Sequence, residues 1–296
     1  MSDTVEGIQN VECVRRFARC CTDGWLQGWH ERNGGNLTYR LTPEDVDACA
    51  PFFYGEAQGA AQNTSASAGA WVDLGIQAPS LGGQYFLSTG SGKYMRNVAD
   101  ELSDAAGIVE LNADGSAYRV VWGLENGGKP TSELPTHVMN HAVRAQATDG
   151  ANRVIYHAHC PNVIALSTLI APGARQWTRI LWKSMTECIV VFPDGVGVVP
   201  WMVPGGADIA RATSQLMDRF AACVWTQHGL FGSGASFDEA FGLMHTIEKS
   251  AMLYLVAKAA NGGAEPAFLI SDDELRAVCN DFNVQPADEF LDGGAQ

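Results

Sequence analysis

Hydrophobic residues recur along the chain with two periods, one typical of helices and one typical of strands. Near the start of the chain, large apolar residues recur every three or four positions: Val14, Phe17, Cys21 and Trp25. This spacing predicts an amphipathic helix. After the turn-rich segment 33–36, hydrophobic and polar residues alternate over 37–41, which predicts a half-buried strand.

The later segments alternate between strand and helix patterns, and no internal repeat is visible. Strands are predicted at 85–87, 107–111, 117–122, 153–159, 188–192, 196–199 and 223–228. Helices are predicted from 131 onward, at 162–170, 208–222 and 237–260, and from 271 onward. Asp114-Gly115 and Asp194-Gly195 each separate two of the strands, as hairpin turns do. The pattern predicts one α/β domain over residues 1–296, with a partly antiparallel sheet.

Two of the helix starts carry capping signals. Thr131 and Ser132 offer a hydroxyl for an N-cap, with Pro135 tolerated in the first turn. Ser271 is followed three residues later by Glu274, which is the pattern of a capping box. By contrast, residues 55–70 are small and polar without any period, so we expect a flexible surface insertion there.

Composition and charge exclude several classes of protein. Of the 296 residues, 46% are hydrophobic and 18% are charged, which is enough apolar material for a large core. The net charge is −14, which argues against a binder of nucleic acid or of anionic membranes. A small anionic substrate stays possible, because backbone N–H groups and a metal can bind it locally.

The chain shows no secretory signal peptide and no uninterrupted apolar run long enough to span a membrane. Its eight cysteines include no CxxC pair and lie mostly in apolar contexts. We therefore expect a reduced, cytoplasmic protein.

The sharpest chemical signal is the pair His157 and His159. On a strand, residues two apart point to the same face, so both imidazoles can reach one metal ion. His228, at the end of another predicted strand, adds a third ligand, and three imidazoles with an open position are typical of catalytic zinc. The alternatives are a pair of hydrogen-bonded core histidines or surface strand residues. A cupin-like site would need a nearby carboxylate, which is missing after Cys160.

A rival site lies on the predicted helix that starts near residue 131. Glu133, His137 and His141 are four residues apart and share one helix face. The order of a zincin motif is missing, so a structural or supporting hydrogen-bonding role is favoured for the two histidines. Glu133 itself is either a stabiliser of the helix N-terminus or a general acid/base beside the metal.

Three segments could bind an anion through backbone N–H groups and polar side chains: 33–36, 89–93, and Thr131 with Ser132. The second departs from a Walker A loop, since it has Leu87 in place of the first glycine and Tyr94 in place of Ser or Thr. Each could also be an ordinary turn.

Glu187 is a lone carboxylate that enters an apolar segment. Burial would raise its pKa and suit it to proton transfer. A strand end that faces solvent is the alternative.

Taken together, seven stretches resemble the class II aldolase/adducin family, and within it the rhamnulose-1-phosphate aldolases. These stretches are GWHERNGGNLTYRL, TGSGKYMRN, PTSELPTH, HAHCPNVIAL, TECIVVFPDGVGVVPWMVPG, HGLFGSG and DEAFGLMHTIEKSA. They occur in the family's order from about residue 21 to residue 250. The HAH and HG motifs are shared across the family, whereas PWMVPG and TECIVVFPDGVG are specific to the rhamnulose-phosphate branch. Residues 42–84 follow no family pattern.

The resemblance implies an α/β fold with a central, largely antiparallel sheet layered by helices, assembled as a four-fold symmetric homotetramer. It implies one Zn²⁺ per subunit, held by His157, His159 and His228, with Glu133 as catalytic acid/base. Glu187 would reach the active site of a neighbouring subunit. The substrate phosphate would contact Asn33, Asn36, Ser91, Gly92, Thr131 and Ser132.

The implied reaction is the reversible aldol cleavage of L-rhamnulose 1-phosphate to dihydroxyacetone phosphate and L-lactaldehyde, in L-rhamnose catabolism. The alternatives are another branch of the family, a fuculose-phosphate aldolase or a ribulose-phosphate 4-epimerase, and a non-catalytic adducin-like scaffold.

Overall fold

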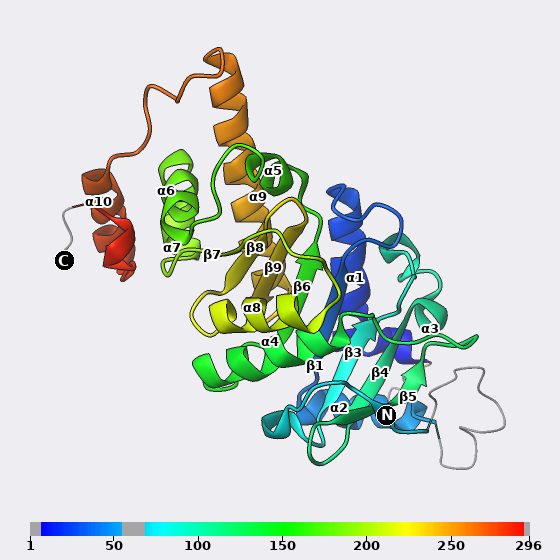
Figure 1. Ribbon diagram of the computed structural model, residues 1–296. Coiled ribbons are helices and arrows are strands. Elements are labelled where there is room, and N and C mark those ends of the chain that lie inside the picture. The colour runs from blue at the N-terminus through cyan, green and yellow to red at the C-terminus, as the bar shows by residue number, and fades with distance from the viewer. Residues whose placement is uncertain (1–6, 55–68, 293–296) are drawn as a thin grey trace, which may run out of the picture.

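A nine-stranded sheet forms the centre of the protein, as the computed structural model shows for residues 7–54 and 69–292 (Figure 1). The strands are β1 (Asn36–Arg40), β2 (Val72–Asp73), β3 (Tyr85–Thr89), β4 (Ala106–Leu111), β5 (Ala117–Gly123), β6 (Val154–Ala158), β7 (Gly197–Val199), β8 (Ala222–Trp225) and β9 (Gly229–Gly234). Their order is β2-β5-β4-β3-β1-β6-β9-β8-β7. Only the β7–β8 pair in this sheet is parallel. The predicted α/β fold with a largely antiparallel sheet is confirmed.

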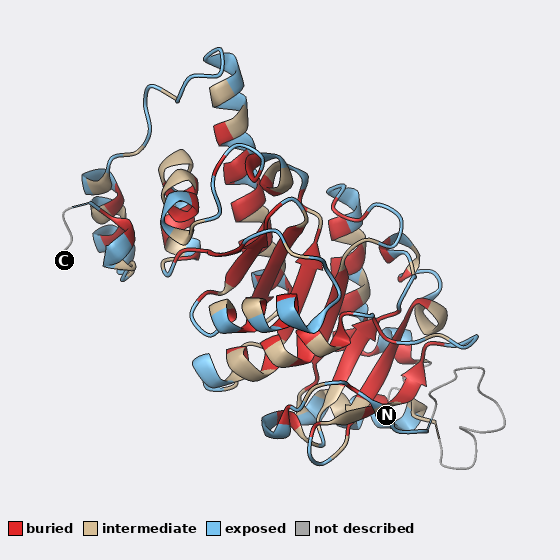
Figure 2. Cartoon of the chain, viewed as in Figure 1, coloured by how far each residue is buried: buried red, intermediate tan, exposed pale blue. Residues whose placement is uncertain are grey.

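Helices cover both faces of the sheet. They are α1 (Glu12–Leu26), α2 (Pro43–Cys49), α3 (Leu102–Ala105), α4 (Leu134–Ala147), α5 (Pro161–Leu166), α6 (Ala174–Ser184), α7 (Glu187–Val191), α8 (Ala207–Met217), α9 (Phe237–Ala260) and α10 (Asp272–Phe282). In Figure 1, α4 and α8 lie in front of the sheet, and α1 and α9 lie behind it. Their inward sides are buried, as are nearly all strands (Figure 2). The predicted insertion lies, except for residues 69 and 70, outside the described residues.

Strand β1 shows the effect of this double cover. All five of its residues are buried, including Thr38 and Arg40, although the alternating pattern predicted a half-buried strand. Leu37 and Tyr39 belong to the large core that also holds Phe17 of α1 and Phe237 of α9. Since successive side chains alternate, Thr38 faces α4 on the other side. The polar positions of β1 therefore form a buried polar layer.

The predicted hairpin of 188–192 and 196–199 is wrong. The first segment is the short helix α7, which buries Cys188 and Ile189 and exposes Glu187. A short apolar run fits either element by period alone, and packing against α9 and α10 decides for the helix here. The second segment, β7, pairs in parallel with β8 after the chain returns through α8.

Other boundaries also differ from the predictions. Helix α4 begins at Leu134 with Glu133 as its N-cap residue, so Glu133 lies before the first turn. Among the described residues, no side chain caps the start of this helix. Strand β8 ends at Trp225, which leaves His228 in a turn. The pattern did not predict β9, α2 or α6, whereas the bounds of α9 and the Ser271 capping box are confirmed.

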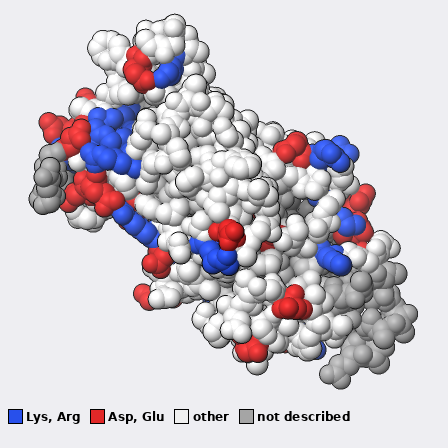
Figure 3. Space-filling model, viewed as in Figure 1, with Lys and Arg blue, Asp and Glu red and all other residues white. Residues whose placement is uncertain are grey.

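Charged side chains gather over α6 and α10, while much of the rest of the viewed face is uncharged (Figure 3). The charges there are paired, because Arg179 bridges Asp272 and Asp292, and Lys183 also contacts Asp272. The pairing ties the C-terminal helix to α6. Among residues 7–54 and 69–292, no helix combines the length and apolarity that a membrane crossing requires.

One buried carboxylate connects α9 to the start of α5. Glu248 is 5% exposed, and its oxygens accept hydrogen bonds from the backbone N–H groups of Asn162 and Val163, both at 2.9 Å. A carboxylate at a helix N-terminus satisfies donors that lack a partner within the helix. Since α5 directly follows His159 in the chain, this contact also supports the candidate metal ligands.

We expect Glu248→Gln to lower the free energy of unfolding by about 1–3 kcal/mol, because the amide can accept from only one of the two backbone N–H groups. The measurement is the urea unfolding curve at neutral pH. The control is Glu125→Gln, which changes an exposed carboxylate in a turn. Equal unfolding midpoints for the two variants would contradict the assignment.

Candidate active site

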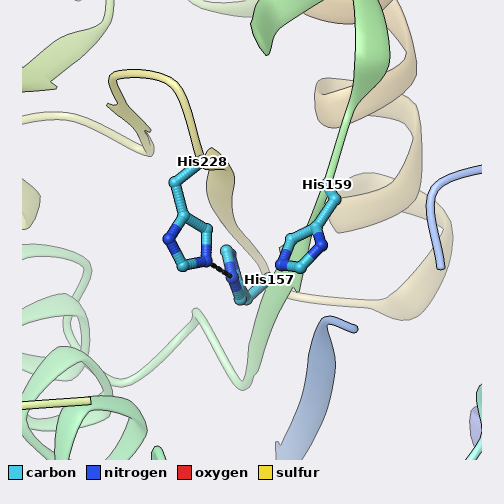
Figure 4. Close-up of side chains that lie close together, drawn as sticks. All are labelled: His157, His159 and His228. Carbon is cyan, nitrogen blue, oxygen red and sulfur yellow. Dashed lines mark hydrogen bonds between the residues drawn. The ribbon is translucent and has the colours of Figure 1, made fainter. Parts of the chain in front are cut away.

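Three histidines from two parts of the chain meet at one end of the sheet (Figure 4). His157 lies on β6, and His159 follows the end of that strand two residues later. His228 lies in the turn between β8 and β9, where Gln227 adopts a left-handed conformation with a φ of 59°. Because β6 and β9 are adjacent antiparallel strands, the turn lies beside the end of β6. One potential ligand atom of each histidine lies within 4.8 Å of the others.

The spacing of these nitrogens suits a tetrahedral metal ion. Nε2 of His157 and Nε2 of His228 are 3.2 Å apart. Two nitrogens that bind one zinc ion at about 2.05 Å with tetrahedral angles lie about 3.3 Å apart. Nδ1 of His157 lies 3.2 Å from the carbonyl oxygen of Leu230, and Nδ1 of His159 lies 2.6 Å from Oε1 of Glu31. Donation from Nδ1 to these oxygens leaves both Nε2 lone pairs available to a metal.

Burial keeps two of the imidazoles in the neutral form that binds metal. It holds the pKa of His157 well below its usual value, and the neighbouring His159 and His228 lower this pKa further. Burial likewise lowers the pKa of His228 to about 4. The cluster opens on a cavity of about 500 Å³ whose lining includes His159, His228 and Glu31. A ligand can therefore reach the open side of the cluster.

Glu133 is the buried carboxylate beside this cluster. It is 8% exposed and accepts a hydrogen bond of 3.0 Å from Nδ2 of Asn36. Asn36 is the direct partner of His157 in the β1–β6 register, so their side chains share one face of the sheet. Burial raises the pKa of Glu133, whereas the Asn36 hydrogen bond and the electrostatic interaction with His159 lower it. Such an environment suits a group that both takes up and releases a proton.

The predicted anion loop 33–36 packs against the histidines. Gly35 has a φ of 73°, and a Cβ atom there would lie 2.7 Å from the carbonyl oxygen of His157. A Cβ atom at Gly34 would meet the His159 ring at 2.8 Å. Glycine is therefore required for this close approach. Asn33 is exposed at the start of the loop.

The other two predicted anion loops are held together by backbone hydrogen bonds. Ser91 N–H donates to the carbonyl of Lys129 at 2.8 Å, and Thr131 N–H donates to Thr89 at 2.8 Å. The Thr89 hydroxyl in turn accepts from Leu37 N–H at 3.2 Å, which places the loops beside the start of β1. Polar groups of these loops are exposed at Ser91, Gly92 and Ser132, whereas Thr131 is buried. The three predicted loops thus meet at the end of the sheet that carries the histidines.

The rival metal site on α4 does not form within the described residues. His137 and His141 both contact the Thr38 hydroxyl at 2.8 Å, and His137 also contacts the side-chain oxygen of Asn36. These contacts occupy nitrogens that a metal would need. Sequence reasoning missed Thr38, which could have been found because it lies two residues from Asn36 on the same strand face.

Glu187 is apart from this cluster. It is the first residue of α7, it is exposed, and its side chain makes no hydrogen bond or ion pair within the part of the chain that the structure describes. Its predicted role depends on a neighbouring subunit.

Comparison with known proteins agrees with this arrangement. Residues 15–255 match the family model of the class II aldolase and adducin N-terminal domain. The chain belongs to the class II aldolase and adducin family. Class II aldolases are metal-dependent, and the three histidines are a candidate site for that metal.

Two relatives are similar over nearly the whole chain. A rhamnulose-1-phosphate aldolase of Pectobacterium carotovorum is 43% identical over 97% of this chain and 99% of its own length. One from Klebsiella pneumoniae is 42% identical over 94% of this chain and 96% of its own. The solved structure of a sugar-phosphate aldolase from Thermotoga maritima shares the fold, with a TM-score of 0.66, 24% identity, and coverage of 86% of this chain and 97% of that one.

We expect His157→Ala to lose bound divalent metal, because two imidazoles leave the ion under-coordinated. The measurement is metal content by plasma mass spectrometry after dialysis. The control is His245→Ala, a histidine that packs against Trp29 and Phe241 outside the cluster and that should leave metal content unchanged. Full metal content in the His157 variant would contradict the assignment of the ligands.

Proposed function

We propose that this protein catalyses the reversible aldol cleavage of L-rhamnulose 1-phosphate to dihydroxyacetone phosphate and L-lactaldehyde, in L-rhamnose catabolism. The observation that carries the proposal is the convergence of His157, His159 and His228 beside the buried Glu133. It is supported by the similarity, over nearly the full length, to relatives named rhamnulose-1-phosphate aldolases.

The proposed metal is one Zn²⁺ per subunit, with His157, His159 and His228 as ligands. Three neutral imidazoles fit zinc, and the Nε2–Nε2 distance of 3.2 Å agrees with tetrahedral coordination. When bound, zinc supplies a Lewis acid for the ketose oxygens as the carbon–carbon bond breaks. Leu230 and Glu31 orient the rings of His157 and His159 through their Nδ1 atoms.

Glu133 transfers the proton in this proposal. Cleavage breaks the bond between C3 and C4, the ionised Glu133 carboxylate takes up the proton of the C4 hydroxyl, and the electron pair stays on the dihydroxyacetone phosphate fragment. Glu133 then protonates C3 of that fragment, and removes the same proton in the synthetic direction. The raised pKa of the buried carboxyl favours a group that can hold this proton.

The phosphate of the substrate is proposed to contact the three loops at the end of the sheet. Donors for it are Asn33, Asn36, Ser91, Gly92, Thr131 and Ser132. Their anchoring by backbone hydrogen bonds positions the substrate, so that C3 lies near Glu133.

We place the protein in a four-fold homotetramer in the cytoplasm, in which Glu187 reaches the active site of a neighbouring subunit. Its side chain is exposed and makes no hydrogen bond or ion pair in the described chain, so it is available for such a contact. All eight cysteines are free, which agrees with a reducing compartment.

The direct test is an enzyme-coupled assay of dihydroxyacetone phosphate released from L-rhamnulose 1-phosphate, with and without a chelator. We expect release that stops on chelation and returns with Zn²⁺, and a lower kcat/KM for L-fuculose 1-phosphate. Conversion of L-ribulose 5-phosphate with its carbon chain intact would instead assign the epimerase activity. If none of these three sugar phosphates reacts, the result would favour a non-catalytic, adducin-like scaffold protein.

Glu133→Gln should retain zinc and lower kcat for cleavage by about 10²–10⁴-fold, because the amide cannot exchange a proton at C3. Zinc content and steady-state kinetics are measured on the same preparation. Near-normal turnover would refute the proposed role of Glu133.

Mixing two inactive variants tests the role of Glu187. In tetramers of Glu133→Gln and Glu187→Ala subunits at equal amounts, about a quarter of the active sites should have both carboxylates if Glu187 comes from a neighbour. Activity is measured on co-expressed, doubly tagged tetramers whose mass is verified by light scattering. Absence of any recovery would place Glu187 outside the neighbouring active site.

A further inference from the structure

A chain of buried hydrogen bonds connects the middle of α4 to Glu133. His141 Nε2 contacts the Thr38 hydroxyl at 2.8 Å, and the same hydroxyl contacts Nδ1 of His137 at 2.8 Å. Nε2 of His137 contacts Oδ1 of Asn36, whose Nδ2 donates to Oε2 of Glu133 at 3.0 Å. Five side chains from two elements thus form one continuous series.

The series follows from the matching repeats of a helix and a strand. Glu133, His137 and His141 are four residues apart, which is about 6 Å along a helix. Asn36 and Thr38 are two residues apart on one face of β1, which is about 6.6 Å along a strand. Since α4 covers this face of β1, each strand side chain lies between two from the helix.

The direction of the hydrogen bonds is set by the carboxylate. An ionised Glu133 can only accept, so the Asn36 amide must present its NH₂ group to it and its oxygen to His137. His137 then donates from Nε2 and accepts at Nδ1 from the Thr38 hydroxyl. The Thr38 hydroxyl has a single hydrogen, which it donates to His137. Its contact with His141 must therefore be a hydrogen bond that it accepts from Nε2–H of His141. Each group therefore donates toward Glu133.

Burial maintains this single arrangement. Thr38, His137 and His141 are completely buried, and burial lowers the pKa of His137 to about 3 and that of His141 well below its usual value. Both rings are therefore neutral, as the series requires. Nδ1 of His141 has no partner among the described residues, which agrees with an unprotonated nitrogen at the end of the series.

We propose that His141, Thr38 and His137 are positioning residues that lock the Asn36 amide and, through it, the carboxylate of Glu133. This inference rests on the proposed function and deepens it, since it assigns Asn36 to Glu133 in addition to any contact with phosphate. Without the series, the amide can rotate about its side-chain bonds and Glu133 loses its oriented donor.

The first test compares Thr38→Val with Thr38→Ser. Valine has nearly the shape of threonine but lacks the hydroxyl, so we expect kcat for cleavage of L-rhamnulose 1-phosphate to fall about tenfold to hundredfold, with KM within about twofold and zinc unchanged. Serine retains the hydroxyl and should recover most of kcat. The matched control is Ser88→Ala, which removes a buried hydroxyl from the strand residue directly opposite Thr38.

A second pair of variants covers the case in which Thr38→Val does not fold. His137→Gln retains an N–H donor for Asn36, whereas His137→Leu removes it. We expect the glutamine variant to retain more of kcat than the leucine variant at equal zinc content. Equal losses in the two variants would overturn the inference.

The series of hydrogen bonds also has a spectroscopic signature that can be measured without an activity assay. In ¹⁵N-histidine protein, solid-state NMR should show the His137 ring neutral with its hydrogen on Nε2, and a hydrogen on Nδ1 would overturn the inference. If the wild-type protein cleaves the substrate and Thr38→Val has the same kcat, the positioning role of the series is overturned, while the proposed function stands. If the wild-type protein does not cleave the substrate, the proposed function is overturned and, with it, the positioning role of the series in that reaction.

Discussion

The antiparallel register between β1 and β6 is the constraint on which the site depends. It places Asn36 directly opposite His157, so the residue that donates to Glu133 lies beside a candidate metal ligand. A shift of one residue would turn Asn36 and Thr38 to the other face of the sheet. The carboxylate, the imidazoles and the buried polar layer under α4 would then separate.

The large apolar core and the polar layer serve this register in different ways. On one face, the core that includes Leu37 and Phe17 stabilises the sheet through burial. On the other face, Thr38 and the histidines of α4 allow only one pairing, since any other would leave buried donors or acceptors without partners. The apolar face of the sheet thus stabilises the fold, and the polar face selects the register of β1.

The site also joins segments that are far apart in the chain. Glu248 anchors the start of α5, which follows His159 in the chain. Ser167, directly after the end of α5, accepts a hydrogen bond of 2.7 Å from the N–H group of Gln227, next to His228. Helix α5 therefore supports both sides of the histidine cluster. Glycines at 34 and 35 allow the first loop to approach the same histidines. Helix termini and tight loops thus position the ligands, whereas the strands set their spacing.

The sequence by itself determined the α/β class, most helices and strands, and the candidate ligands, because hydrophobic period and the HAH spacing are local properties. The strand predicted at 188–192 was wrong, since a short apolar run fits a helix or a strand until its neighbours pack against it. The sequence favoured a structural or hydrogen-bonding role for His137 and His141, but it did not name the partner that they share, Thr38. Only the tertiary structure brought β1 under α4, because hydrogen-bond partners about a hundred residues apart have no shared period in the chain.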